Sequence, residues 1–117
     1  MKSLSSAPVS WSKGHPHSSL YNDLYFSTDN GFAEANYVYL DSNQLGERLE
    51  QPGNFAIAET GFGTGLNFLA AWNLFNTNAA LSTKLHFISV EKYPLDKSDL
   101  NRALGLWPEL NHLIEQL

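Results

Sequence analysis

An acidic residue followed by three alternating glycines is the part of this sequence best suited to chemistry. Glu59 stands two positions before Gly61, and Gly63 and Gly65 follow at alternate positions. Glycine adopts backbone angles with φ > 0 and leaves no side chain between the backbone and a ligand. The apolar run before the loop predicts a strand, and the residues after it predict a helix. Because backbone amides at a helix start attract anionic and polar groups, the stretch predicts a ligand-binding loop.

The glycine spacing narrows the kind of ligand. In the dinucleotide fingerprint G-x-G-x-x-G the third glycine would fall on Leu66, and Gly65 comes one residue early. A phosphate-binding P-loop would need Gly-Lys-Ser or Gly-Lys-Thr, which does not follow. The acidic-x-G-x-G-x-G pattern resembles instead the loop of class I S-adenosylmethionine-dependent methyltransferases. The alternative is a glycine-rich turn that serves packing alone.

A second carboxylate follows the next apolar run. Residues 85–90 predict a buried strand, and Glu91 comes directly after it, 26 residues beyond Gly65. In nucleotide-binding α/β folds an acid about 20 residues past the glycines accepts hydrogen bonds from ribose hydroxyls. Glu91 could also simply end a strand in solvent beside Lys92. Its place after a glycine loop and a helix favours the ribose role.

Two predicted strands with a helix between them position these groups. Residues 55–59 and 85–90 read as parallel strands, and residues 66–75 carry apolar side chains at helical spacing. Continuous apolar runs are typical of parallel strands covered on both faces. The sequence therefore predicts an α/β fold built on a right-handed strand–helix–strand unit.

The flanking segments predict short helices and an arm. Helices are expected over residues 32–40, 44–50 and 97–106, and another begins at Pro108. Residues 20–26 are expected to form a short strand or an ordered loop. Residues 1–19, rich in Ser, Pro, Gly and His, are expected to form an irregular arm with Trp11 anchored on the core. His15 and His17 read as polar loop residues and not as a metal pair, so no metal site is predicted.

Composition excludes several classes of protein. The 117 residues contain no cysteine, which excludes disulfides, thiolate nucleophiles and cysteine-based zinc sites. The net charge is −5 and the seven Lys and Arg are scattered, which argues against strong RNA binding by this segment alone. No apolar run approaches the roughly 20 residues that span a bilayer, and no secretion signal is visible. We expect a cytoplasmic protein without membrane contact.

Several segments taken together resemble one family. They resemble the N-terminal methyltransferase domain of the bacterial bifunctional enzyme that completes 5-methylaminomethyl-2-thiouridine in tRNA, over nearly the whole chain from about Trp11. The segments that carry the resemblance are residues 23–27, 31–34, 37–40, 59–69, 86–95 and 107–110.

The resemblance implies a Rossmann-like class I methyltransferase fold, of which this chain is the N-terminal part. Residues 20–117 would supply about two core parallel strands with helices. The remainder of a seven-stranded sheet, and the family's second, FAD-dependent domain, would lie beyond Leu117. FAD is therefore not expected to bind here. With one strand edge unpaired, such a fragment is expected to be marginally stable and inactive alone.

The resemblance also implies an activity and a set of site residues. The activity is methyl transfer from S-adenosylmethionine to the aminomethyl nitrogen of the wobble uridine in tRNA. Glu59 would orient the ammonium group of the cofactor, Glu91 would hold the ribose hydroxyls, and Tyr25 and Phe26 would wall the site. No catalytic base is assigned. The expected cofactor-binding residues are Glu59, Gly61, Phe62, Gly63, Thr64, Gly65, Leu66, Asn67 and Glu91.

Two other functions compete with this one. The chain could be a non-catalytic remnant or a binding module that no longer turns over. A dinucleotide-dependent oxidoreductase is the other enzyme class, and the misplaced third glycine speaks against it.

Overall fold

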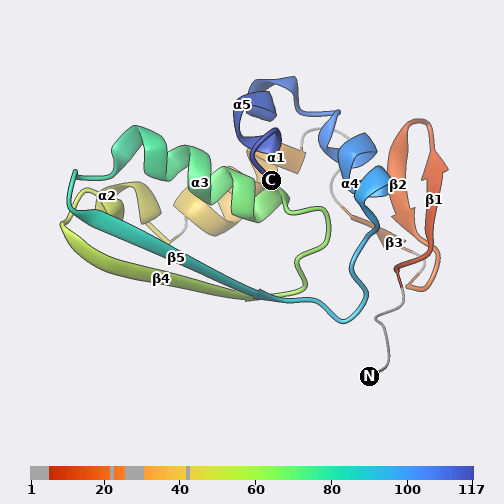
Figure 1. The fold of residues 1–117 in the computed structure, drawn as a ribbon, viewed down its shortest axis with the longest axis horizontal. Coiled ribbons are helices and arrows are strands. Elements are labelled where there is room, and N and C mark those ends of the chain that lie inside the picture. The colour runs from red at the N-terminus through yellow and green to blue at the C-terminus, as the bar shows by residue number, and fades with distance from the viewer. Residues whose placement is uncertain (1–5, 22, 26–30, 42) are drawn as a thin grey trace.

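The chain folds into a parallel pair of strands covered by helices, with a small antiparallel sheet beside them (Figure 1). The computed structural model describes residues 6–21, 23–25, 31–41 and 43–117. The parallel strands are β4 (Gly53–Thr60) and β5 (Thr83–Val90). The antiparallel sheet has the order β1 (Val9–Ser12), β2 (His15–Ser18) and β3 (Asp23–Leu24).

The predicted strand–helix–strand unit is confirmed. Helix α3 (Leu66–Asn78) connects β4 to β5, and the two strands pair in parallel with Glu59 opposite Ser89. The helix extends three residues beyond the predicted end at Phe75. Because parallel strands finish at the same edge of a sheet, the glycine loop after β4 and Glu91 after β5 lie side by side.

The expectation that both faces of the sheet are covered is wrong for the described residues. In Figure 1 helices α1 (Gly31–Ala35), α2 (Leu45–Leu49) and α3 all lie on one side of β4 and β5. Exposure alternates along both strands, and Ile88 and Val90 remain 58% and 67% exposed on the other side. The apolar runs therefore mark a sheet with one face covered and one face open.

The core lies among the helices and against the covered face of the sheet. The largest fully buried side chains are mostly leucines, drawn from α2, α3 and the C-terminal helices: Leu49, Leu69, Leu104, Leu110 and Leu113. The C-terminal elements are α4 (Lys97–Leu104), the 3₁₀ turn η2 (Pro108–Leu110) and α5 (Asn111–Ile114). The helix predicted over residues 32–40 begins as α1 and continues as the π-helical η1 (Asn36–Asp41).

Residues 9–18 form a β-hairpin, so the irregular arm predicted over residues 1–19 is wrong there. Strands β1 and β2 pair antiparallel and turn at Lys13 and Gly14, with φ of 51° and 80°. Two successive residues with positive φ form the tight turn that suits a hairpin. The turn was not predicted because the segment contains few apolar residues.

Trp11 anchors the hairpin on α4, whereas the sequence predicted an anchor on the core. Its indole Nε1 donates a hydrogen bond to Asp99 Oδ1 at 3.3 Å, and the Arg102 guanidinium lies 4.0 Å from the ring centroid. Both partners belong to α4, so the hairpin packs on the C-terminal part of the chain. None of the helices in the described ranges combines the length and hydropathy needed to cross a bilayer.

Candidate functional site

The glycine loop has the conformation that its sequence requires. Gly61, Gly63 and Gly65 have φ of 84°, 57° and 81°, a region that other residues resist. The Gly61 amide donates to the Val90 carbonyl at 2.7 Å, and the Gly65 amide donates to the Phe62 carbonyl at 2.9 Å. The loop is therefore bonded both to itself and to the end of β5.

The loop leads into an uncapped helix start. Gly65 is the N-cap of the 13-residue α3, and as a glycine it has no side chain that could accept a hydrogen bond from the first turn. The first amides of a helix have no partner within the helix, and they carry partial positive charge. This end of α3 is therefore suited to an anionic group such as a carboxylate.

Two hollows flank the glycine loop. The helix-side hollow measures about 210 Å³ and the hairpin-side hollow about 430 Å³. The first is lined by Tyr25, Gly31, Glu34, Ala35, Gly61, Phe62, Gly63, Thr64, Leu66 and Asn67. The second is lined by Ala7, Ser18, Leu20, Tyr21, Asp23, Leu24, Tyr25, Gly61, Gly63, Glu91 and Tyr93. The two hollows share Tyr25, Gly61 and Gly63 among their lining residues, so they adjoin at the loop.

Glu91 lies against the loop, at the edge of the sheet where the sequence predicted it. Its Oε1 accepts a hydrogen bond from the Gly63 amide at 2.9 Å, and its Oε2 accepts one from the Tyr93 amide at 3.2 Å. A carboxylate has about four acceptor positions. The side chain can therefore hold the loop and still accept further hydrogen bonds from a ligand in the hairpin-side hollow.

Glu59 faces the helical layer and lines neither of these hollows. Its Oε1 accepts a hydrogen bond from Ser89 Oγ at 2.9 Å, across the paired strands. Burial raises the pKa of this carboxyl, the charge of Glu91 adds to the rise, and hydrogen bonds from Ser89 and Asn67 oppose it. Asn67 also lines the helix-side hollow.

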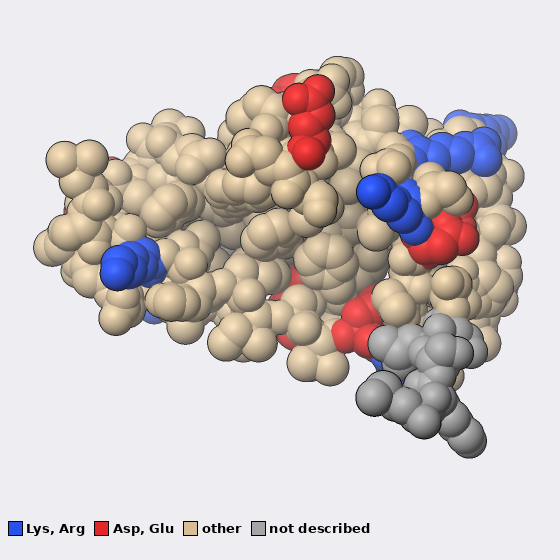
Figure 2. Space-filling model, viewed as in Figure 1, with Lys and Arg blue, Asp and Glu red and all other residues tan. Residues whose placement is uncertain are grey.

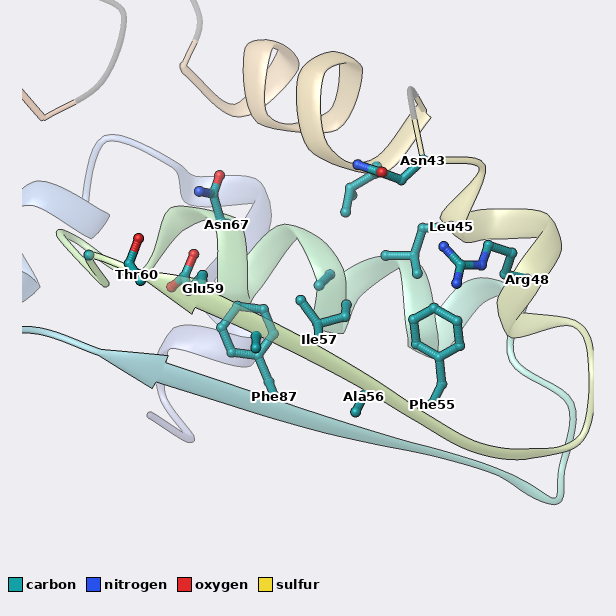
Figure 3. A pocket seen from close by; sticks show the side chains of 14 residues that line it. Asn43, Leu45, Arg48, Phe55, Ala56, Ile57, Glu59, Thr60, Asn67 and Phe87 are labelled. Carbon is teal, nitrogen blue, oxygen red and sulfur yellow. The ribbon is translucent and has the colours of Figure 1, made fainter.

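A third and larger hollow follows the unpaired edge of β4. This edge hollow measures about 660 Å³, and Figure 3 shows Phe55, Ile57 and Glu59 projecting into it from one strand. Arg48 lies at one end, with its guanidinium 4.6 Å from the Phe55 ring centroid. Asn67 lies at the other end (Figure 3). Within the described residues no strand pairs with this edge of β4, and the hollow lies alongside it.

Most of the predicted cofactor-binding residues come together around the two hollows beside the loop. Gly61, Phe62, Gly63, Thr64, Leu66, Asn67 and Glu91 line one or both of them. Gly65 packs against the Phe62 ring, since a Cβ at Gly65 would lie only 2.8 Å from Phe62 Cζ. Tyr25 lines both hollows, whereas Phe26 lies outside the described residues.

Four charged or aromatic residues line the hollows without having been predicted as site residues. Tyr21 and Asp23 come from the N-terminal segment, Glu34 from α1, and Tyr93 stands two residues after Glu91. Tyr21 and Tyr93 form an edge-on pair with ring centroids 6.2 Å apart. Only Tyr93 carried a sequence signal, its closeness to Glu91. In the described part of the chain, no group of three or more His, Cys, Asp or Glu is placed to hold a metal ion.

The chain has close relatives among characterised sequences. It is 52% identical over 117 residues to the tRNA 5-methylaminomethyl-2-thiouridine biosynthesis bifunctional protein MnmC of Marinomonas sp., an alignment covering 97% of this chain and 17% of that protein. The proteins of the same name from Chromobacterium violaceum and Pseudomonas fluorescens are 52% and 50% identical, over 97% and 95% of this chain. The chain matches one part of MnmC. It spans about a sixth of the length of these relatives, which is 17% or 18% in each case.

A solved structure shares the fold. The crystal structure of MNMC2 from Aquifex aeolicus superposes with a TM-score of 0.60 at 18% sequence identity, over 87% of this chain and 37% of that one. At this identity the match shows a common α/β fold and no common activity. No protein-family profile matches the chain.

Proposed function

We propose that this chain is the cofactor-binding part of an S-adenosylmethionine-dependent methyltransferase that acts on the wobble uridine of tRNA. The proposal rests on the glycine loop. Its three glycines have no Cβ atoms, and the loop lies between two hollows, with Glu91 at one end and the start of α3 at the other. The sequence similarity to MnmC over nearly the whole chain supports the tRNA substrate.

The residues around the loop fit the two ends of this cofactor. The start of α3, with Thr64 and Asn67, suits the carboxylate of the methionine half. Glu59 would act on its ammonium through Asn67 or a water molecule. Glu91 would accept hydrogen bonds from the ribose hydroxyls in the hairpin-side hollow. These assignments follow the class I methyltransferase pattern, in which the acid before the glycines and the acid after the next strand bind opposite ends of the cofactor.

The task left to the protein is mainly positioning. When bound, S-adenosylmethionine supplies an already activated methyl group. The side chains around the loop must hold it so that an unprotonated amine can approach in line, about 3 Å away, with water excluded. The two hollows and the half-buried Tyr25 side chain would do part of this. No residue of this chain is assigned as the base.

Binding of the tRNA itself would need more than this segment. The net charge is −5, and on the face shown in Figure 2 the Lys and Arg side chains form no continuous basic surface, and some of them lie beside Asp or Glu. A nucleic-acid surface normally gathers basic residues. The chain spans about a sixth of the length of its relatives. We therefore assign the tRNA contacts and any FAD chemistry to other parts of such a bifunctional protein.

Calorimetric titration of the purified chain with S-adenosylhomocysteine tests the cofactor site, with NAD as the control ligand. We expect binding of the first and none of the second. A chain that circular dichroism shows to be folded, but that does not bind S-adenosylhomocysteine, would overturn the proposal. Preferential binding of NAD would favour the oxidoreductase.

Catalysis is tested separately, by supplying radiolabelled S-adenosylmethionine and a tRNA that carries the 5-aminomethyl group. We expect binding of the cofactor by this chain without methyl transfer, because we assign the tRNA contacts to other parts of such a protein. Methylation by the chain alone would contradict that assignment while confirming the reaction.

A further inference from the structure

The hairpin-side hollow lies between two parts of the chain. Among its described lining residues, seven come from residues 7–25 and four come from the glycine loop and the turn after β5. Most of the first group belongs to the antiparallel sheet of β1, β2 and β3, or lies next to it; we call this the N-terminal sheet. In Figure 1 its hairpin stands beside α4, at the opposite end of the molecule from α2. The shape of the hollow therefore depends on where the N-terminal sheet sits.

The N-terminal sheet is hydrogen-bonded within itself. Four residues of β1 pair with four residues of β2, and β3 adds two further pairs. The Ser19 amide also donates to the Pro8 carbonyl at 3.2 Å, which ties the two ends of the hairpin together. Because these bonds lie inside the sheet, it can keep them while its position changes.

The contact of the N-terminal sheet with α4 runs through one side chain. The Trp11 indole donates to Asp99 Oδ1 at 3.3 Å, and the Arg102 guanidinium lies 4.0 Å from the ring centroid. No described residue of the N-terminal sheet belongs to the hydrophobic core or is among the half-buried side chains packed on it. Regions with few buried apolar contacts open at a lower free energy than the whole protein unfolds. We therefore expect the sheet to separate from α4 before the core unfolds.

Two further contacts join the walls of the hollow itself. The Ala7 amide donates to the Pro94 carbonyl at 2.9 Å, and the rings of Tyr21 and Tyr93 meet edge-on with centroids 6.2 Å apart. Tyr21 remains 67% exposed in this pair. A single hydrogen bond and an exposed ring contact each contribute little net stability in water. The contact through Trp11 is therefore the main attachment that holds the hollow closed.

We propose that the N-terminal sheet moves as one body to open and close the hairpin-side hollow, and that Trp11 on α4 holds it closed. Trp11 is then a positioning residue, since it lines neither hollow beside the glycine loop. The inference concerns access to the hollow and goes beyond the proposed function, because it does not depend on which ligand fills the space.

The absence of cysteine from the chain makes a single introduced thiol a specific reporter of this opening. Ser18→Cys places the thiol on β2, at a position that is 7% exposed and lines the hollow. Thr83→Cys makes the same exchange of hydroxyl for thiol at the start of β5, which is 5% exposed. The measured quantity is the rate at which 5,5′-dithiobis(2-nitrobenzoic acid) labels each thiol in the folded chain.

Trp11→Leu should raise the labelling rate of the Ser18→Cys chain roughly tenfold or more, because the hydrogen bond and the cation–π contact are both lost. It should leave the rate of the Thr83→Cys chain unchanged. Arg102→Met removes the cation alone and should raise the Ser18→Cys rate roughly 2- to 5-fold. Lys97→Met, which removes the same charge from an exposed position on α4, is the matched control and should have no effect.

Hydrogen exchange separates movement of the sheet from unfolding of the hairpin. In Trp11→Leu and in Arg102→Met the Ala7 amide, which bridges to Pro94, should exchange faster, whereas the Ser19 amide should keep its wild-type rate. Equal acceleration of both amides in both variants would overturn the proposal, since the hairpin would then unfold and not move as a body. Unchanged labelling of Ser18→Cys in both variants would also overturn it.

Discussion

The Glu91 carboxylate accepts a hydrogen bond from the Gly63 amide at 2.9 Å, and this bond joins the loop after β4 to the end of β5. The other oxygen accepts from the Tyr93 amide at 3.2 Å. One side chain therefore fixes the loop and the turn that follows β5. Hydrogen bonds from backbone amides to a charged acceptor are among the stronger ones in proteins. We infer that Glu91 shapes the site as well as contacting the ligand.

Glu91→Gln should weaken both the site and the fold. The glutamine oxygen can still accept from Gly63, but its NH₂ group cannot accept from the Tyr93 amide, and the charge is lost. We expect the dissociation constant of S-adenosylhomocysteine to rise about tenfold or more, and the free energy of unfolding to fall by about 1 kcal/mol. Calorimetry and urea denaturation measure the two effects.

The control for this change is Glu109→Gln, which removes the same charge from an exposed position on η2. It should leave both quantities within the scatter of the wild type. Unaltered affinity in Glu91→Gln would exclude the ribose role, whatever happens to stability.

Glu59 should make stability depend on pH. Burial raises the pKa of Glu59 in the folded state above the ordinary 4.5. Between the unfolded-state pKa and the folded-state pKa, the folded state therefore binds more protons than the unfolded state. The stabilisation is complete below pH 4.5 and is lost as the pH rises through the folded-state pKa. Glu59→Gln should therefore become more stable relative to the wild type as the pH rises through this window, and the difference should then level off.

Urea denaturation of both proteins between about pH 4 and pH 8 measures this difference. Taking the difference cancels the titration of other carboxyls, such as Asp96, whose pKa the Asp99 amide lowers. Glu50→Gln, at an exposed position after α2, should show no such trend. A constant difference across the pH range would contradict the raised pKa of Glu59.

Gly65→Ala tests the geometry of the loop. Gly65 has φ of 81°, and an added Cβ would lie 2.8 Å and 2.9 Å from two atoms of the Phe62 ring. Backbone strain and the clash should together lower the free energy of unfolding by about 2 to 4 kcal/mol. They should also displace the start of α3, so the affinity for S-adenosylhomocysteine should fall.

Gly14→Ala is the matched control because its φ of 80° is nearly the same and nothing lies within 4 Å of the added Cβ. It should cost about 1 to 2 kcal/mol and leave binding unchanged. Equal losses of stability in the two variants would show that the Phe62 ring moves away from the added Cβ without lowering the free energy of unfolding.

The glycine loop could be predicted because its information is local. Alternating glycines determine which positions take positive φ, and Leu66 begins α3 as the sequence indicated. The direction in which the Glu59 side chain points could also have been predicted from the sequence. Side chains alternate along a strand, so Glu59 shares a face with Phe55 and Ile57, toward the helices and the edge hollow.

Tyr21 carried no comparable signal for its place at the site, and Tyr25 was expected there only because of the family resemblance. They reach the glycine loop from a segment more than 30 residues earlier, and the contact depends on a hairpin that packs on α4 through Trp11. Hydrophobic periodicity indicates which face of an element is buried, but not which distant segment covers it. The open face of β4 and β5 was missed for the same reason, because an apolar run does not show how many layers surround it.

The open sheet should make the chain associate with itself. Ile88 and Val90 are 58% and 67% exposed on β5, and β4 and β5 each leave one edge unpaired among the described residues. Exposed apolar strands with free edges are templates for pairing with another chain. We expect sedimentation equilibrium to show oligomers at about 10 to 100 µM. Replacing both residues by lysine should weaken association about tenfold or more, because charge on the strand opposes docking.

Leu81→Lys is the control for this change, since Leu81 is fully exposed in the turn before β5 and does not lie on the sheet face. It should leave association as in the wild type. Equal effects of the two changes would point to general solubility and not to the sheet. A wild type that stays monomeric over the whole concentration range would mean that the open face is compatible with a stable single chain.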